Sequence, residues 1–596
     1  LFSKLAFSKM PNVDIHRNTY FTVLRSLKDS MNVESELDNA FMRLKNLRSS
    51  QKDWYDYIYS KSIITDSTAT VIPLINQFKE RFPNEDPKII NELENRIELG
   101  SQSYTLFSLF SAMGDDYFMK EDYENASNYY EQSIDYNQDN YIIYENLAIS
   151  YDLSKRTDMA HEMYDLVLNN FKPTNGRVEF YKGLLLVRLG EIEVRDNGKL
   201  IAEMGAQTKY LAEWYRYFGG LADKIEGSVI PSDKPGIFNF TRYEPLGVIG
   251  MITAWNSPLL LLAWKLAPAL AAGNTAVIKP SEYTSASTLE FMNLVEDAGF
   301  PTGVVNAITG FGLEVGAPLV DHPEVDKVAF TGSDVSGQKI YEAAAKKIMP
   351  VTLELGGKSP NIVFEDADFE AAIMGAISGI FAATGQTCIA GSRLLVQRSI
   401  HDKFVKRLVE VAGAAKIGDP MSTETHVGPV TTMPQYEKIM DYIGIAKSEG
   451  ATCVLGGDAY NGEGVKGKQF VQPTIFTGVN NQMRIAQEEV FGPVLSVIPF
   501  ENEAEAVAIG NDIVYGLAAG VWTSDIGRAL RMSEKLKAGT VWVNTYRAVS
   551  FTSPFGGYKR SGEGRESGKD AIKEFLQVKS VWIAQQTTAA NPFIMR

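Results

Sequence analysis

Cysteine is almost absent from this chain, whose 596 residues include only Cys388 and Cys453. So few cysteines exclude a disulfide scaffold and favour a reducing compartment, and no targeting signal is visible, so we expect a cytoplasmic protein. Histidine is also scarce: the chain has five, and none has close metal-ligand spacing to another. We therefore expect no metal site.

The chain also lacks an excess of basic residues. Lysine and arginine total 58 against 73 aspartate and glutamate residues, which leaves a net charge of −15. This balance argues against nucleic acid or an anionic membrane as partner. The stretch 247–264 has no charged residue, but Asn256-Ser257-Pro258 interrupts it. A strand, a polar turn and a buried helix fit this stretch better than a membrane span.

The N-terminal part of the chain is helical by pattern and contains a repeat. Gly114, Ala126 and Ser133 have counterparts 34 residues later in Ala148, Ala160 and Val167. Small residues at such positions let antiparallel helices cross closely, and this period resembles the tetratricopeptide repeat, whose concave surfaces bind peptides or proteins. We predict such repeats over 106–190, including the first helix of a third unit at 177–190, and an unassigned helical region over 1–105. A generic helical bundle is the alternative.

From about Glu191, short apolar runs alternate with helical stretches. The first runs are 247–254, 275–278, 304–308, 327–330, 350–354 and 361–364, and a second set is 394–397, 452–455, 494–499, 518–522 and 540–544. Continuously apolar strands separated by helices are typical of parallel sheets buried on both faces. We predict an α/β fold, with a doubly wound parallel sheet followed by a second α/β domain.

Cys388 lies among small residues in the stretch Gly385-Gln386-Thr387-Cys388-Ile389-Ala390-Gly391. A substrate can approach such a thiol, and Glu354, on a glycine-flanked strand end, can reach back toward it. A thiol nucleophile with a nearby carboxylate base is suited to oxidise or hydrolyse a carbonyl group through a thioester. The alternative is an inert core cysteine, the commoner role of a free thiol.

From about Val194 to the C-terminus, ordered motifs resemble the aldehyde dehydrogenase superfamily. They are Thr253-Ala254-Trp255-Asn256-Ser257-Pro258, Ile278-Lys279-Pro280-Ser281-Glu282, Phe330-Thr331-Gly332-Ser333, Leu353-Glu354-Leu355-Gly356-Gly357-Lys358, Gly385-Gln386-Thr387-Cys388, Glu488-Glu489-Val490-Phe491-Gly492-Pro493 and Pro554-Phe555-Gly556-Gly557-Tyr558-Lys559. The resemblance implies an enzyme that oxidises an aldehyde, with three catalytic residues. Cys388 would be the nucleophile, Asn256 would donate its amide to the oxyanion, and Glu354 would activate the water that hydrolyses the thioester. Relatives that pass the acyl group to coenzyme A lack this carboxylate, so a free acid is the expected product.

The resemblance also implies NAD as the cofactor. Lys279 and Glu282 would hold the adenosine ribose, where a carboxylate repels the 2′-phosphate of NADP. Gly332 and Ser333 would open a helix that faces the pyrophosphate. Asp334 departs from the family pattern, because its carboxylate would repel phosphates unless it points away. The other implied cofactor residues are Trp255, Gly312, Gly316, Gly337, Leu355, Gly356, Glu489 and Phe491.

Family positions that line an aldehyde tunnel form a further set. They fall on Ser257, Leu260, Trp264, Ala382, Thr387, Ile389, Arg547, Val549 and Phe555. Ser257 and Ala382 are smaller than the aromatic residues often found there, which favours a roomy tunnel. We hypothesise that Arg547 meets a polar or anionic substrate tail; a solvated arginine at the rim is an equally good interpretation.

The resemblance breaks before Asp196, where the family's cofactor domain normally has further helices and strands and this chain has its helical repeats. The loss predicts weaker homo-oligomers, although 238–247 and 578–583 resemble the family's oligomerisation strands. The expected domains are 191–353 with 555–577 for NAD, 354–554 for catalysis, and 578–596 for a C-terminal oligomerisation strand and tail. The alternative function is a helical-repeat scaffold that carries a truncated, weakly active or inactive dehydrogenase module.

Overall fold

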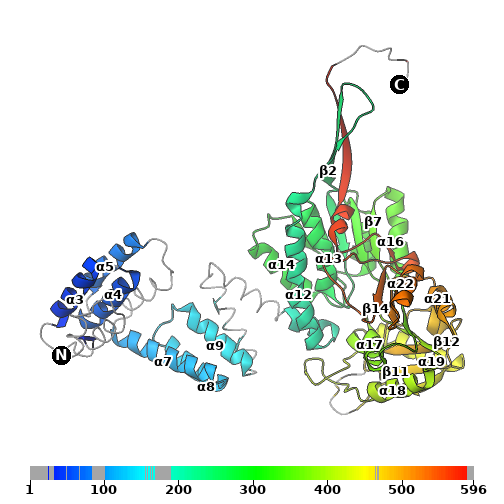
Figure 1. The fold of residues 1–596 in the computed structure, drawn as a ribbon, viewed down its shortest axis with the longest axis horizontal. Helices are drawn as coiled ribbons and strands as arrows, with labels where there is room; N and C mark the ends of the chain where they lie inside the picture. Colours follow the sequence, from blue (N-terminus) through cyan, green and yellow to red (C-terminus); the bar gives the residue numbers. More distant parts are fainter. Residues whose placement is uncertain are drawn as a thin grey trace. The chain divides into compact units, whose positions relative to one another are not determined.

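The computed structural model divides the chain into two compact units, Leu1–Val178 and Glu179–Arg596 (Figure 1). It describes residues 24–25, 33–47, 50–65, 68–82, 101–154, 156, 159–160, 163, 166–167, 189–462, 465, 467, 469–586 and 593. The helix expected at 177–190 therefore lies outside the described residues, except for its last two positions.

The described part of the first unit is helical. Its helices are α3 (Val33–Leu47), α4 (Gln51–Thr65), α5 (Thr68–Arg81), α7 (Ser101–Met119), α8 (Tyr123–Ile134) and α9 (Tyr141–Leu153). Helices α3, α4 and α5 share an apolar core, in which the rings of Phe41 and Tyr57 stack with centroids 3.8 Å apart. The region that the sequence left unassigned thus has a hydrophobic core of its own.

Helices α7 and α8 cross where small residues permit it. A Cβ at Gly114 would lie 2.5 Å from the ring of Tyr130, so only glycine fits this crossing. The other repeat positions, Ala126, Ser133, Ala148, Ala160 and Val167, have no exposed surface. Close helix packing at the repeat positions agrees with the helical interpretation, while the tetratricopeptide assignment stays a prediction.

The second unit contains a six-stranded sheet with the order β15-β7-β6-β3-β4-β5. The strands are β3 (Val248–Ile252), β4 (Thr275–Lys279), β5 (Val305–Ala307), β6 (Lys327–Thr331), β7 (Val351–Glu354) and β15 (Gly562–Glu563). All neighbours are parallel except β15, which pairs antiparallel with β7. The chain leaves β3 in one direction toward β4 and later returns on its other side as β6, so the sheet is doubly wound, as predicted.

Helices connect and cover these strands. They are α12 (Ile201–Gly219), α13 (Pro258–Ala271), α14 (Ala286–Asp297), α15 (Ala317–Asp321) and α16 (Asp334–Lys347). The uncharged stretch 247–264 forms β3, a turn and the buried start of α13, as the sequence predicted. Among the described residues, no helix combines the length and the apolarity that crossing a membrane requires.

A second sheet of seven strands has the order β10-β11-β12-β9-β8-β13-β14. Its strands are β8 (Pro360–Val363), β9 (Arg393–Gln397), β10 (Thr452–Leu455), β11 (Thr474–Thr477), β12 (Val494–Phe500), β13 (Ala518–Trp522) and β14 (Thr540–Val543). The helices that accompany them are α17 (Phe369–Phe381), α18 (His401–Gly413), α19 (Met433–Ser448), α20 (Arg484–Gln487), α21 (Glu503–Asn511) and α22 (Ile526–Lys535).

Two expectations from the sequence were wrong for this second sheet. The run 361–364 was grouped with the first sheet but belongs to the second, because the chain crosses over directly after Glu354. Strand β11 was missed, since only two of its four residues, Ile475 and Phe476, are apolar.

A third sheet consists of β1 (Val229–Ile230), β2 (Ile237–Pro245) and β16 (Leu576–Ala584), all antiparallel. In Figure 1, β2 and β16 extend as an arm beyond the rest of the second unit. The arm exposes the large apolar side chains of Phe238, Val578 and Trp582. Exposed apolar residues on a sheet are typical of a contact surface, and self-association through this arm stays a prediction.

Two helical glycines provide a matched test of the crossing between α7 and α8. We expect Gly114→Ala to destabilise these helices by about 1–3 kcal/mol, because the added methyl group overlaps the Tyr130 ring. The same change at Gly205, inside α12 with nothing within 4 Å of the new Cβ, should instead stabilise its helix by up to about 1 kcal/mol. Hydrogen exchange of the helix amides measures both effects in the full chain, and equal effects at the two sites would contradict this packing.

Candidate active site

The site forms where strand ends of the first sheet meet a loop of the second. Asn256 follows β3, Gly332 follows β6, and Glu354 is the last residue of β7. Crevices at the carboxyl ends of parallel strands, where the strand order reverses, are the usual ligand sites of doubly wound sheets. Cys388 comes from the loop between α17 and β9. The fold therefore brings the three expected catalytic residues to one crevice from three segments.

The loop that carries Cys388 has an unusual backbone. Ala383 and Thr384 both have φ of 54°, in the left-handed region that costs a residue with a β-carbon roughly 1–3 kcal/mol. The surroundings hold this conformation: the N–H of Ala383 donates to Glu203 Oε1 at 2.7 Å, and Thr384 Oγ1 donates to the Gly428 carbonyl at 3.2 Å. The loop is thus fixed from two sides, and the thiol position is set before any ligand binds.

Glycine residues let the loop approach the end of β7. A Cβ at Gly357 would lie 2.6 Å from the carbonyl oxygen of Cys388. Asn256 adds a polar link, because its Nδ2 donates to the carbonyl oxygen of Gln386 at 3.0 Å. This bond orients the amide and leaves its second N–H available for another acceptor.

The thiol of Cys388 is strongly influenced by its surroundings. Burial is the largest cause and the nearby carboxylate of Glu354 the next, and together they raise the pKa of Cys388 to about 12. Lys199 and a backbone hydrogen bond from Ile389 act in the opposite direction. The resting cysteine is therefore a neutral thiol at pH 7, and a reaction through its thiolate needs a proton acceptor.

Glu354 has the properties of such an acceptor. Its side chain is buried, and neither carboxylate oxygen has a hydrogen-bond partner among the described residues. Burial, and then the charge of Glu566, raise the pKa of Glu354 well above its ordinary value. A carboxylate with a raised pKa and free lone pairs can take up a proton near neutral pH.

A buried lysine lies behind this carboxylate. Lys265 Nζ donates to Glu566 Oε1 and to Thr331 Oγ1, and no part of Lys265 is exposed. The charge of Lys265 lowers the pKa values of both Glu354 and Glu566, against the effect of burial. The sequence analysis missed this pair, although a single lysine inside the apolar helix α13 was a visible signal.

Two cavities meet at Cys388. The smaller, of about 120 Å³, is lined by Glu354, Cys388 and much of the set expected to hold the cofactor, namely Trp255, Gly332, Ser333, Leu355, Gly356, Glu489 and Phe491. The larger, of about 650 Å³, is lined by Cys388, Asn256 and the expected tunnel residues Ser257, Leu260, Trp264, Thr387, Ile389, Arg547, Val549 and Phe555. The thiol is accessible from both sides, as a reaction between two ligands requires.

Hydrogen bonds and close contacts hold the lining residues of the smaller cavity in place. Glu489 Oε1 accepts the N–H of Gly357 at 2.9 Å, and a Cβ at Gly356 would lie 2.3 Å from Glu489 Oε2. Helix α16 begins at Asp334, and the hydroxyl group of Ser333 caps it. The carboxylate of Asp334 accepts from Arg560 at 3.0 Å and from Tyr515 at 3.2 Å. The charge of Arg560 and the neutral hydroxyl group of Tyr515 thus bind the carboxylate that departs from the family pattern.

Several expected residues lie outside these two linings. Lys279 and Glu282 form an ion pair at 3.0 Å, and Gly312 and Gly316 bound a short helical turn before α15. Gly337 is packed under Leu355, whose Cδ2 would lie 2.5 Å from an added Cβ. Ala382, expected in the tunnel, is not among the lining residues of the larger cavity, and its carbonyl oxygen accepts from Arg547 at 3.0 Å.

Some lining residues were not expected from the sequence. Gln435 and Lys438, on α19, complete the first cavity. Helix α12 contributes one wall of the second through Gln207, Tyr210 and Trp214. These helices carry no motif at the lining positions, so only the tertiary structure could place them.

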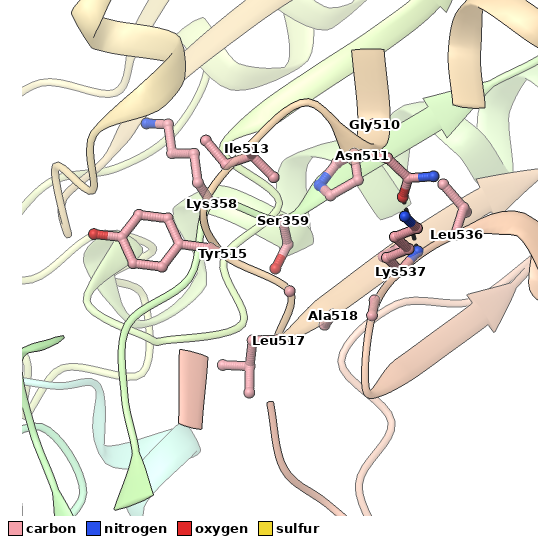
Figure 2. A pocket seen from close by; sticks show the side chains of 14 residues that line it. Lys358, Ser359, Gly510, Asn511, Ile513, Tyr515, Leu517, Ala518, Leu536 and Lys537 are labelled. Atoms are coloured by element: carbon pink, nitrogen blue, oxygen red, sulfur yellow. Dashed lines mark hydrogen bonds between the residues drawn. The ribbon is translucent and has the colours of Figure 1, made fainter. Parts of the chain in front are cut away.

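A third cavity is too small to be a reaction site. It has about 10 Å³, room for one water molecule, and Lys358, Ser359, Asn511 and Tyr515 are among its lining residues (Figure 2). Burial lowers the pKa of Lys358 to about 7, and its Nζ has no hydrogen-bond partner among the described residues. The described residues contain no group of three or more His, Cys, Asp or Glu side chains that could hold a metal ion.

Comparisons with known proteins agree with this geometry. Residues 187–581 match the model of the aldehyde dehydrogenase family. An aldehyde dehydrogenase of Emericella nidulans is 50% identical over 394 residues, which cover 66% of this chain and 78% of that protein. A (Z)-2-((N-methylformamido)methylene)-5-hydroxybutyrolactone dehydrogenase of Acinetobacter baylyi is 48% identical over 412 residues, covering 69% and 83%.

A solved structure extends the likeness to three dimensions. Betaine aldehyde dehydrogenase from Staphylococcus aureus, crystallised with NAD⁺, is 43% identical and superposes with a TM-score of 0.67, over 69% of this chain and 83% of that one. The doubly wound sheet, the crevice at its strand ends and the family match over most of the second unit lead to one conclusion. The chain belongs to the aldehyde dehydrogenase family.

Proposed function

We propose that this protein oxidises an aldehyde to a carboxylic acid with NAD, through a thioester on Cys388 that Glu354-activated water hydrolyses. The observation that carries the proposal is the position of Cys388, which is shared by two cavities and lies beside an unpartnered buried carboxylate. Membership in the aldehyde dehydrogenase family supports the oxidation of an aldehyde in general. The residues of this chain support the more specific steps, which are thioester formation on Cys388 and its hydrolysis.

The residues of the smaller cavity fit a dinucleotide. Glycine at 356 leaves space that a side chain would fill, and the capped start of α16 presents backbone N–H groups suited to phosphates. Glu489 and Phe491 would contact the nicotinamide half, and Lys279 and Glu282 the adenosine ribose. NAD, when bound, supplies the acceptor for the hydride that leaves the substrate carbon. The Glu282 carboxylate favours NAD over NADP.

The first steps use the thiol and the amide. Glu354 takes the proton of Cys388, and the sulfur adds to the aldehyde carbon, which forms the C–S bond and places negative charge on oxygen. Asn256 donates its free N–H to that oxygen, a contribution worth roughly 3 kcal/mol for one such donor. Loss of hydride then leaves a thioester on Cys388.

The last steps return the enzyme to its starting state. Glu354 first releases to solvent the proton that it took from Cys388, and then takes a proton from water. The resulting hydroxide adds to the thioester carbon, and the C–S bond breaks. The products are a carboxylic acid and the Cys388 thiolate, which recovers its proton. Because Glu354 is buried, the proton that it releases must be passed on through the interior, where the ion pair of Lys265 and Glu566 interacts with it.

Replacement of the carboxylate separates thioester formation from hydrolysis. For Glu354→Gln we expect steady-state turnover to fall by about 10²–10⁴-fold, since no base activates water. Because Glu354 also takes the proton of Cys388, the variant should form its thioester slowly near pH 7 and faster at pH 9, where hydroxide can deprotonate the thiol. Hydrolysis should be slower still, so mass spectrometry after incubation with NAD and propanal at pH 9 should show one acyl group on Cys388. Hydroxylamine should release that group.

The control for this experiment is Glu501→Gln, an exposed glutamate that the two cavities do not include. It should turn over at the wild-type rate. Full activity of Glu354→Gln would contradict the hydrolytic mechanism. Failure of the wild-type chain to reduce NAD with any aldehyde of a broad panel would instead favour the scaffold alternative.

The raised pKa of Cys388 predicts a steep pH dependence of alkylation. In a Cys453→Ser background, the rate constant for iodoacetamide should rise about tenfold per pH unit from pH 7 to 9, because the thiolate fraction grows in proportion below the pKa. The denatured chain should level off near pH 8.5, the ordinary value for cysteine. A folded-state profile that levels off at or below pH 8 would show that the thiol is not protonated as described.

A further inference from the structure

The larger cavity contains a cation without a carboxylate partner. Arg547 lines it together with Cys388, and no carboxylate of the described residues forms an ion pair with this guanidinium. Arg547 Nη1 donates to the carbonyl oxygens of Ser378 at 3.1 Å and Ala382 at 3.0 Å. These two bonds occupy Nη1 and fix the group, while the N–H groups of Nε and Nη2 remain free to bind an acceptor.

From this arrangement we infer that the enzyme prefers aldehydes that carry a carboxylate at the far end of the molecule, which Arg547 binds through Nε and Nη2. The inference rests on the proposed function, since it names the substrate class for the same site. An arginine with two adjacent free donors matches the planar geometry of a carboxylate.

Other groups of the cavity support an anionic acceptor. Trp264 is 5% exposed, and its indole Nε1, a group that can only donate, has no partner among the described residues. The hydroxyl group of Thr387 is buried and also has no hydrogen-bond partner among the described residues. Lys199 is buried outside the cavity lining, and it donates to the lining residue Ser257, at Oγ, over 2.8 Å. Two further donors without described partners therefore accompany Arg547 in this cavity.

The cavity also contains groups that would favour a different ligand. Gln207 Oε1 is a buried acceptor without a described partner, and the carboxylate of Glu213 faces the cavity from α12. The charge of Glu213 is already paired with Arg216, at 2.6 Å. Glu203 is the carboxylate that most stabilises the charge of Arg547, but its Oε1 accepts from Ala383 and it lies beyond ion-pair distance. Among the side chains that line the cavity, Lys209 and Arg547 carry positive charge and Glu213 carries negative charge, so their sum is one positive charge.

This charge distribution also predicts what the enzyme rejects. A trimethylammonium aldehyde would place a permanent cation near Arg547 and Lys199, and a quaternary ammonium cannot satisfy the free donors of the cavity. The similar protein from Staphylococcus aureus is a betaine aldehyde dehydrogenase. The present chain should therefore differ from that relative in its preferred substrate, despite the shared fold.

The test compares three probes on the full-length protein with NAD: 4-oxobutanoate, butanal and betaine aldehyde. We expect kcat/KM for 4-oxobutanoate to exceed that for butanal by about 10- to 100-fold, as one charged bidentate contact typically contributes. Betaine aldehyde should be poorer than butanal. Equal values for 4-oxobutanoate and butanal, or a preference for betaine aldehyde, would overturn the inference.

Two variants assign the preference to Arg547. Arg547→Gln should lower the ratio of 4-oxobutanoate to butanal to about one, mainly by raising KM for 4-oxobutanoate. Arg547→Lys keeps a charge but loses the fork, so its ratio should be intermediate. The matched control is Arg398→Gln, an exposed arginine that lines neither cavity, and it should keep the wild-type ratio. A ratio unchanged in Arg547→Gln would refute the role of this residue.

The outcomes also separate this inference from the proposed function. Turnover of butanal with NAD that depends on Cys388, without a preference for 4-oxobutanoate, would defeat only the substrate class. Absence of turnover with all three probes would contradict the proposed function itself. Should Arg547→Gln fail to fold, because it releases the carbonyl groups of Ser378 and Ala382, the wild-type probe series and Arg547→Lys still decide the question.

Discussion

The active-site geometry depends on the close approach of the Cys388 loop to the end of β7. This approach is possible because Gly357 has no side chain, and an added Cβ would overlap the Cys388 carbonyl oxygen. The loop keeps its left-handed turn at Ala383 and Thr384 because Glu203 and Gly428 accept hydrogen bonds from it. Backbone strain at one site is thereby offset by hydrogen bonds from distant segments, a common arrangement around reactive groups. The distance between thiol and carboxylate follows from this packing.

Burial then determines the chemistry of both groups. Water is largely excluded from Cys388 and Glu354, so the pKa of each is raised and neither ionises readily alone. A proton that leaves the thiol has an acceptor beside it, and the positive charge of Lys265 moderates the cost of a buried carboxylate. The selectivity inferred for the larger cavity rests on a different feature, the half-buried guanidinium of Arg547 in its lining.

Much of the fold could be predicted from local signals. Continuous apolar runs marked β3, β4, β6 and β7 within a residue or two, since strands buried on both faces carry a strong pattern. The strand β11 was missed because only two of its four residues are apolar. The run 361–364 was placed in the wrong sheet because an apolar pattern does not reveal which sheet a strand joins.

The sequence by itself determined the family and the identity of the reactive groups, because ordered motifs around Asn256, Glu354 and Cys388 are local and chemically specific. It could not determine the electrostatic surroundings of those groups. Lys199, Glu203, Lys265 and Glu566 lie far from Cys388 along the chain and carry no motif that marks them as neighbours, and α12 became a cavity wall only through packing. Charges act through space rather than along the sequence, so only the tertiary structure decided the protonation of the thiol and the sign of the charge that a substrate meets.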